Sequence, residues 1–181
     1  GIILTIQCLS MKTSTEIDSI ALHIGEEKAV ELVAKAGFDA WDFSMFQMCN
    51  KKKEVLVPTN HPTAQSDYLA FARKLKQIGL DNGIVCNQGH APFPSSPKSK
   101  EWFKRAIECL AEAGGEILII HPMNDGTPEE NAEMYFELLP FAKEHNVKIA
   151  TENMWNWYEG AEHSSFAACA TPESFNAHLD A

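Results

Sequence analysis

Short apolar runs alternate with longer amphipathic segments along most of this chain, and this alternation limits its fold more than any other feature. Five runs have the composition of β-strands, and the segments between them carry apolar residues at three- and four-residue spacing. The predicted strands are Ile3–Cys8, Ala40–Phe43, Ile84–Cys86, Ile117–Ile120 and Lys148–Thr151. The pattern predicts an α/β fold in which helices cover a sheet of parallel strands.

The ends of the predicted helices carry local signals. Gly37, Gly79 and Gly114 each end an amphipathic segment at a point where a left-handed residue is needed, and Asn146 does so for the fourth segment. Thr127–Glu130 predicts the start of that fourth helix, because it offers an N-cap hydroxyl, a proline in the first turn and a carboxylate three residues after the cap. A strand is predicted after each of the four ends.

We expect residues 1–181 to form a single domain. The chain has 181 residues, of which 45% are hydrophobic and 22% charged, enough for one sizeable core without an evident linker. A second helix start at Thr171–Glu173 leads to Ala181 with neither an end signal nor a further strand. We therefore expect the chain to be the N-terminal part of a larger fold, with about five βα units.

Charge and cysteine content argue against several classes of protein. The formal net charge is -10 and the only basic run is Lys51–Lys53, so no basic surface for nucleic acid is expected. The five cysteines are widely spaced and odd in number, which favours buried thiols in a reducing compartment. Apolar runs fall short of the roughly 20 residues that span a bilayer. We expect a cytoplasmic protein without a nucleic-acid or membrane partner.

Polar residues end four of the predicted strands or follow them closely: Asp42, His90, His121 and Glu152. The last three are each separated by 31 residues, about one βα unit, which predicts equivalent positions on neighbouring strands. In βα barrels the reactive face lies at these carboxyl ends. Imidazole and carboxylate groups that converge there are suited to holding a divalent metal or to moving a proton. The alternative is that each side chain is only a hydrogen-bonded strand end.

Four segments of the chain resemble strands two to five of the xylose-isomerase-like superfamily. They are Gly37–Phe43, Asn87–Phe93, Ala111–Pro122 and Val147–Met154. That superfamily contains sugar and sugar-phosphate isomerases and epimerases, hydroxypyruvate isomerase, inosose dehydratase and zinc-dependent apurinic endonucleases. The resemblance implies a TIM (β/α)8 barrel that is incomplete here, because strands six to eight are absent.

The resemblance also implies roles for individual residues. Glu152 matches the glutamate that ends strand five, which is a metal ligand and commonly an acid/base group. His90 and His121 match positions on the substrate wall of the isomerases or at the metal sites of the endonucleases. Asp42 matches an acidic position that binds a substrate hydroxyl, with a purely structural carboxylate as the alternative. Trp155, in the loop after Glu152, is a further substrate-binding prediction as a wall against a sugar face, although packing under its own loop is the alternative.

The implied activity is that of a metal-dependent sugar or sugar-phosphate isomerase or epimerase. A divalent ion (Mn, Mg, Zn or Co) would be held by Glu152, with His121 as a further possible ligand, while a proton moves through an enediolate. The family's other ligands lie on strands six to eight, so we expect this fragment to be inactive and its metal site weak. Open sheet edges are also expected to favour homo-oligomers.

Two other functions fit parts of the pattern. A zinc-dependent apurinic endonuclease would use the same barrel, but the acidic composition argues against a DNA substrate. A non-catalytic, doubly wound five-stranded binding module would fit the chain length. That module needs a phosphate-binding loop, and the segment Gln7–Thr13 after the first predicted strand contains no glycine.

Overall fold

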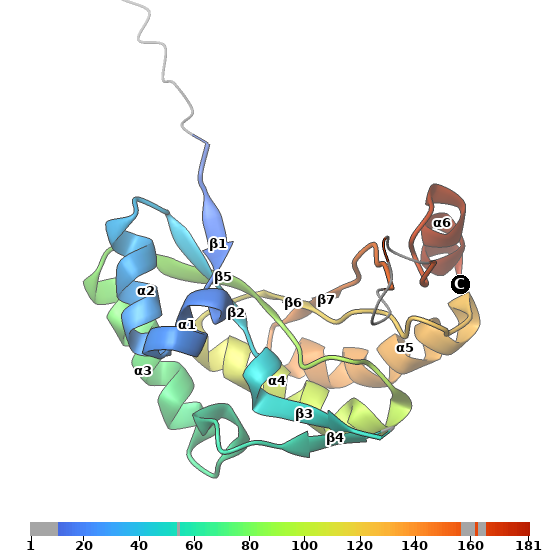
Figure 1. Ribbon diagram of the computed structural model, residues 1–181, viewed down its shortest axis with the longest axis horizontal. Coiled ribbons are helices and arrows are strands. Elements are labelled where there is room, and N and C mark those ends of the chain that lie inside the picture. The colour runs from blue at the N-terminus through green and yellow to red at the C-terminus, as the bar shows by residue number, and fades with distance from the viewer. Residues whose placement is uncertain (1–10, 54, 157–161, 163–165) are drawn as a thin grey trace, which may run out of the picture.

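A parallel sheet of five strands organises the part of the chain that the computed structural model describes, residues 11–53, 55–156, 162 and 166–181 (Figure 1). Its strands lie side by side in chain order. They are β1 (Ser14–Glu16), β2 (Ala40–Ser44), β5 (Val85–His90), β6 (Ile117–Ile119) and β7 (Lys148–Ala150). Four of the five predicted strands are thereby confirmed. The prediction at Ile3–Cys8 lies outside the described residues, and the first described strand of the sheet is β1.

The strand order separates the two architectures that the sequence left open. A doubly wound sheet reverses its strand order at a switch point, where its ligand binds. Here each strand pairs with the next one along the chain, always in parallel, so the described sheet has no such reversal. The order is that of five consecutive units of a TIM-type barrel, and the predicted fold class is confirmed. The described strand order is not that of a doubly wound sheet.

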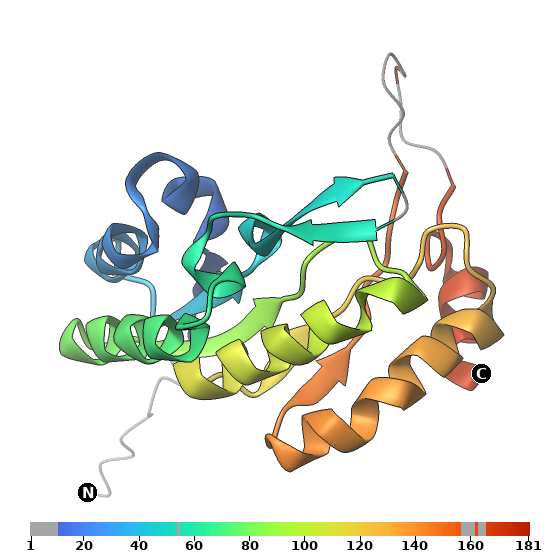
Figure 2. The same ribbon diagram turned by 90° about the horizontal axis from the view of Figure 1, so that it is seen from below.

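Helices cover one face of the sheet, as Figure 2 shows for α3, α4 and α5, which lie side by side. The described helices are α1 (Asp18–Ile24), α2 (Glu26–Lys35), α3 (Tyr68–Asp81), α4 (Lys100–Ala113), α5 (Pro128–Glu144) and α6 (Pro172–Asp180), with short 3-10 helices η1 (Phe46–Met48), η2 (Pro62–Ala64) and η3 (Pro97–Ser99). Their apolar stripes make the core with the sheet: α4 packs on β5 and β6 and buries Phe103, Ile107 and Leu110 completely, in the same core as Trp41 and Phe43 of β2. No described helix is long and apolar enough to cross a membrane.

An antiparallel hairpin of β3 (Cys49–Lys52) and β4 (Val55–Pro58) is inserted between β2 and α3. The sequence analysis did not predict it and treated Lys51–Lys53 only as a basic run. The hairpin stands beside the carboxyl ends of the sheet strands rather than extending the sheet (Figure 2). It therefore adds a wall to the face where the polar strand ends gather.

Three of the four predicted helix ends are confirmed by a positive φ angle, at Gly37, Gly114 and Asn146. The prediction at Gly79 was wrong. Gly79 is buried inside α3, which continues to Asp81, and the left-handed residue after that helix is Gly83. A Cβ atom on Gly79 would lie only 2.9 Å from the indole Nε1 of Trp41, so this glycine allows close helix–sheet packing.

The capping box at the start of α5 is formed as predicted. The Thr127 hydroxyl accepts a hydrogen bond from the Glu130 amide at 3.2 Å, and the Glu130 carboxylate accepts one from the Thr127 amide at 2.9 Å. We expect Thr127→Ala to lower the free energy of unfolding by about 1 kcal/mol, because the Glu130 amide at the helix start loses its acceptor. Thermal unfolding followed by circular dichroism measures the change. Thr127→Ser keeps the hydroxyl and should unfold near the wild-type temperature; equal losses in both variants would contradict the prediction.

Candidate active site

The register of the sheet brings three predicted site residues together at the carboxyl ends of β5, β6 and β7. Ile119 pairs with Ala150, so His121 and Glu152, each two residues further, occupy equivalent positions as predicted. His90 pairs with Ile119, not with His121, so the prediction of an equivalent position was wrong for His90. The stagger between β5 and β6 is two residues. Because side chains alternate with a period of two, this offset leaves His90 on the same face as the other two.

His90, His121 and Glu152 form a compact cluster. One ligand atom from each residue lies within 4.8 Å of the others. The Glu152 Oε2 atom is 3.1 Å from Nε2 of His121 and 3.6 Å from Nε2 of His90. The imidazole side chains are 14% and 17% exposed, whereas Glu152 is 42% exposed, so the carboxylate is the more accessible member. The cluster thus combines two nearly buried imidazoles with one carboxylate that a small molecule can reach.

Asp42 lies behind the cluster, in contact with His90. Its carboxylate is 2% exposed and lies 3.0 Å from Nδ1 of His90. Ser44 and Gln88 each donate a further hydrogen bond to it, at 2.9 Å and 2.7 Å. A carboxylate in this position requires the proton of a neutral His90 to be on Nδ1, which leaves the lone pair of Nε2 directed toward the cluster. The geometry places Asp42 as a support for His90, and its predicted contact with a substrate hydroxyl stays a prediction.

The charges in the cluster shift the pKa values of three groups. Burial raises the pKa of Asp42, but the hydrogen bond and charge of His90 outweigh it, and the net pKa lies below the usual 3.8. Burial lowers the pKa of His90, yet the hydrogen bond and charge of Asp42, with Glu152, place it above 6.5. For His121, burial and the His90 charge together exceed the attraction of Glu152, and the pKa falls below 6.5. His121 is therefore the less basic of the two imidazoles.

The donor set fits a divalent metal ion. Two imidazole nitrogens and one carboxylate oxygen are the ligands typical of a catalytic zinc site and also suit manganese or cobalt. His121 Nδ1 is one of few buried side-chain nitrogen or oxygen atoms without a hydrogen-bond partner among the described residues. The Asp42–His90 contact is the kind of carboxylate support that metal-binding histidines usually have. The sequence suggested one carboxylate and at most one imidazole, whereas the structure brings together three donors.

Aromatic rings that the sequence analysis did not select surround the imidazoles. Phe46 lies with its ring 5.7 Å from His90 and 6.0 Å from His121, and the ring of Phe93 is 5.2 Å from His121. The only signal for Phe93 was its place at the end of the segment that carries His90. Trp155 is 58% exposed in the loop after β7, and its role in a substrate wall stays a prediction.

Comparison with known proteins places this barrel in a family. The family model described as xylose isomerase-like TIM barrel matches residues 30–170, well over half of the chain and all three residues of the cluster. The chain belongs to this family. The resemblance seen in the sequence is thereby confirmed. No curated protein matches the chain.

Solved structures of other proteins share the fold. A D-tagatose 3-epimerase-like protein superposes with a TM-score of 0.63 at 19% identity, over 93% of this chain and 60% of its own. The D-allulose 3-epimerase from Methylomonas sp. in complex with D-allulose superposes with a TM-score of 0.60 at 15% identity, over 94% of this chain and 58% of its own. The IOLI protein with a bound zinc atom superposes with a TM-score of 0.52 at 19% identity, over 78% of this chain and 51% of its own. The chain therefore spans between half and two thirds of the length of these structures.

Removing the charge of Asp42 should affect His90 in a predictable direction. We expect Asp42→Asn to lower the pKa of His90 toward 6.5, because the hydrogen bond and charge of the carboxylate hold it higher. Affinity for a divalent metal should fall by about 10–100-fold. A pH titration of the His90 ring by NMR measures the first effect and a cobalt titration the second. Ser44→Ala retains the carboxylate and should change both much less; an unshifted His90 pKa in Asp42→Asn would contradict this account.

Proposed function

We propose that the chain contributes a metal-binding and substrate-binding wall to a sugar isomerase or epimerase. The observation that carries the proposal is the cluster of His90, His121 and Glu152, with ligand atoms within 4.8 Å, at the face where barrel enzymes of this kind place their chemistry. Glu152 Oε2, His90 Nε2 and one nitrogen of His121 would hold the ion. When bound there, a divalent metal would polarise adjacent carbonyl and hydroxyl oxygens of a ketose or related hydroxy-carbonyl compound.

Glu152 is the residue that we assign to proton transfer. Its carboxylate is the most accessible group of the cluster, so it can reach the carbon next to a substrate carbonyl. Removal of a proton from that carbon leaves an enediolate. Return of the proton to the opposite face of the same carbon gives the epimer, and its return to the former carbonyl carbon, with the hydroxyl proton moving between the two oxygens, gives the isomer. The acid that returns the proton belongs, in this proposal, to barrel strands that the chain does not include. The Methylomonas complex with D-allulose and the zinc-bound IOLI protein support a sugar substrate and a metal at this fold.

The proposal is tested by hydrogen exchange into a sugar. The longest polypeptide encoded by the reading frame would be incubated with D-fructose or D-allulose in D2O, with Mn²⁺, Co²⁺, Zn²⁺ or Mg²⁺ added in turn. Deuterium next to the ketose carbonyl, detected by NMR and lost when the metal is chelated, is the expected result. A polypeptide that binds no stoichiometric metal, or binds it without exchanging a proton of any ketose tested, would refute the proposal.

Metal affinity should depend on pH through His90. The pKa of His90 lies above 6.5, and a proton on Nε2 competes with the metal for that atom. We therefore expect the affinity to be constant above this pKa and to fall by about tenfold per pH unit below it. Cobalt titrations at successive pH values measure the profile. Asp42→Asn should move the fall to lower pH, and an unchanged affinity across the range would mean that His90 is not a ligand.

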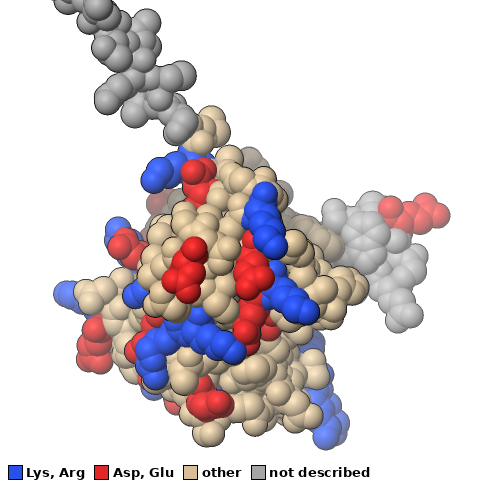
Figure 3. All heavy atoms as spheres, turned by 90° about the vertical axis from the view of Figure 1, so that its left-hand side faces the viewer, with Lys and Arg blue, Asp and Glu red and all other residues tan. Residues whose placement is uncertain are grey.

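The endonuclease reading has one observation in its favour, since two imidazoles and a carboxylate are also ligands of zinc phosphodiesterases. The charge balance of the chain does not favour a DNA substrate. On the face that carries α2 and α3, basic and acidic side chains are interspersed, and Lys74 and Arg73 form ion pairs with Glu27 and Glu112 (Figure 3). The net charge of the chain is -10. Cleavage of an oligonucleotide with an abasic site would be needed to revive this alternative.

A further inference from the structure

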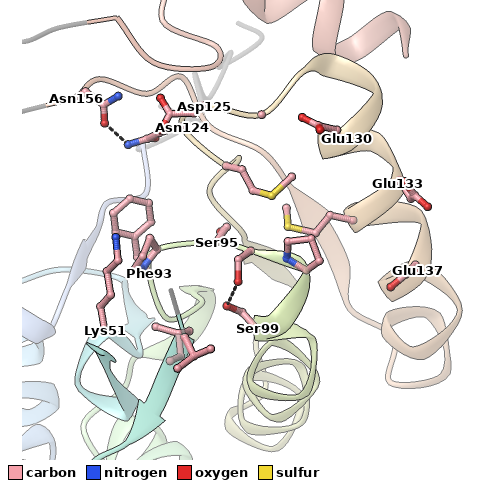
Figure 4. Close-up of a pocket in the computed structure, with 18 residues that line it drawn as sticks. Lys51, Phe93, Ser95, Ser99, Asn124, Asp125, Glu130, Glu133, Glu137 and Asn156 are labelled. Atoms are coloured by element: carbon pink, nitrogen blue, oxygen red, sulfur yellow. Dashed lines mark hydrogen bonds between the residues drawn. The ribbon is translucent and has the colours of Figure 1, made fainter. Parts of the chain in front are cut away.

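A cavity of about 870 Å³ lies beside the cluster of His90, His121 and Glu152, and the proposed chemistry does not use it (Figure 4). Its walls come from the β3–β4 hairpin, the loop between β5 and α4, the loop between β6 and α5, and α5 itself. Cavities of roughly 300–1,000 Å³ hold organic ligands. Four stretches that are distant in sequence therefore meet around a space large enough for a molecule, when the Asn156 segment is included.

Phe93 borders both this cavity and the cluster. It lines the cavity, and its ring lies 5.2 Å from the ring of His121. Met123 and Asn124, which also line the cavity, follow His121 by two and three residues. A molecule whose reacting end is at Glu152 could thus extend past Phe93 into the cavity. An aromatic wall between two polar sites is also a surface on which a sugar ring can pack.

Unsatisfied polar atoms give an independent sign of a ligand. Among the described residues, the buried side-chain nitrogen or oxygen atoms without a partner are Trp41 Nε1, Ser95 Oγ, His121 Nδ1 and Asn124 Oδ1. Two of these atoms belong to residues that line the cavity and a third to a residue of the cluster. Ser95 is only 8% exposed, and an unpaired buried group of this kind costs about 1–3 kcal/mol. A ligand hydroxyl can both donate and accept, so it could satisfy either oxygen.

The charge of the lining selects against anions. Asp125, Glu130, Glu133 and Glu137 line the cavity, with the three glutamates on α5, and Lys51 on the hairpin is the only basic residue of the lining (Figure 4). Glu130 and Glu137 have other partners, in the capping box and in an ion pair with Lys100. Asp125 and Glu133 still outnumber the single ammonium. A phosphate group would meet net repulsion here, whereas an uncharged polyhydroxylated group would not.

We infer that this cavity is a subsite for an uncharged, polyhydroxylated group that the substrate carries beyond its reacting sugar. The substrate class is then a neutral glycoside or other multi-ring sugar rather than a sugar phosphate. The claim that the bound group belongs to the substrate rests on the proposed function. The claim that the cavity prefers neutral sugars to phosphates is independent of it. Ser95 and Asn124 contribute the polar contacts, and Phe93 contributes the apolar wall that the two sites share.

The test is a binding measurement on the metal-free chain. The side-chain amides of Asn124 and Asn156 are followed by NMR while maltose, cellobiose, sucrose or glucose 6-phosphate is added. At least one neutral disaccharide should shift both amides, and the phosphate ester should bind about tenfold more weakly or not at all. Ser95→Ala should weaken the binding of that disaccharide. Because no metal is present, retained disaccharide binding in a protein that fails to bind metal would refute the proposed function and leave the subsite standing.

Charge reversal gives the sharper comparison. Glu133→Lys should strengthen binding of glucose 6-phosphate by about tenfold, because it removes one repulsive charge and adds an attractive one. Glu144→Lys makes the same change on the exposed end of the same helix, outside the cavity, and should have no effect. The inference is overturned if no disaccharide shifts the lining amides. It is also overturned if glucose 6-phosphate binds the unmodified chain as tightly as the disaccharides, or if only a cation such as spermidine binds.

Discussion

Glu152→Gln should lower the affinity of the chain for a divalent metal by about 100-fold or more, since even loss of a supporting residue behind a ligand costs 10–100-fold. The substitution keeps the size of the side chain and replaces a charged oxygen donor with a neutral amide. Glu152 Oε2 lies within 3.6 Å of both imidazoles, and Glu152 is the one carboxylate of the described cluster, so the cluster offers no replacement for it. The absorption spectrum of bound Co²⁺, titrated into each protein, measures the affinity and the coordination together.

A matched control separates loss of a ligand from loss of charge. Glu144→Gln makes the same chemical change at an exposed position in the last turn of α5 and should bind cobalt as the wild type does. Thermal unfolding of both variants without metal should be close to wild type, because Glu152 is 42% exposed and the charge loss is minor. Equal cobalt affinity in Glu152→Gln and the wild type would show that the cluster is not the metal site.

The sequence predicted the architecture well because βα alternation is a local pattern. Each strand and each helix is specified by residues that are neighbours in sequence, and Gly37, Gly114 and Asn146 ended helices as local backbone chemistry requires. Gly79 was misassigned because its reason is tertiary: the indole of Trp41 packs where a Cβ would be. The β3–β4 hairpin was missed for a similar reason, since β3 is mostly polar, β4 is a four-residue run that ends in proline, and the two strands pair only with each other.

The candidate site was predictable in membership but not in arrangement. Regular spacing identified His90, His121 and Glu152, but the two-residue stagger between β5 and β6 depends on how the sheet closes and leaves no mark in the sequence. Asp42 was selected for a substrate contact, while its position behind His90 follows from pairing of β2 with β5. Phe46 and Phe93 could not be distinguished from core aromatics, because contact with an imidazole across the barrel mouth is a three-dimensional property.

Gly89 tests how far that arrangement depends on the close approach of two strands. It pairs with Phe43 across β5 and β2, one residue before His90. A Cβ at this position would lie 2.7 Å from the backbone oxygen of Phe43 and 3.0 Å from Cδ1 of Leu110. A backbone carbonyl cannot rotate away as a flexible side chain can, so the strands would have to separate. Their separation would also stretch the contact between His90 and Asp42.

We expect Gly89→Ala to lower the free energy of unfolding by about 3 kcal/mol, the upper part of the range for overpacking in a core. For a chain of this size, that corresponds to a fall of roughly 6–12 °C in Tm. Cobalt affinity should fall as well, since His90 is carried by the displaced strand. Gly37→Ala provides the comparison: its positive φ makes alanine unfavourable, but a Cβ there has nothing within 4 Å. It should lose about 1 kcal/mol and bind cobalt normally. The prediction would be contradicted if Gly89→Ala were as stable as Gly37→Ala and bound cobalt equally well. The close approach of β5 to β2 would then not be what positions His90, and the contact between Asp42 and His90 would have to persist in a wider sheet.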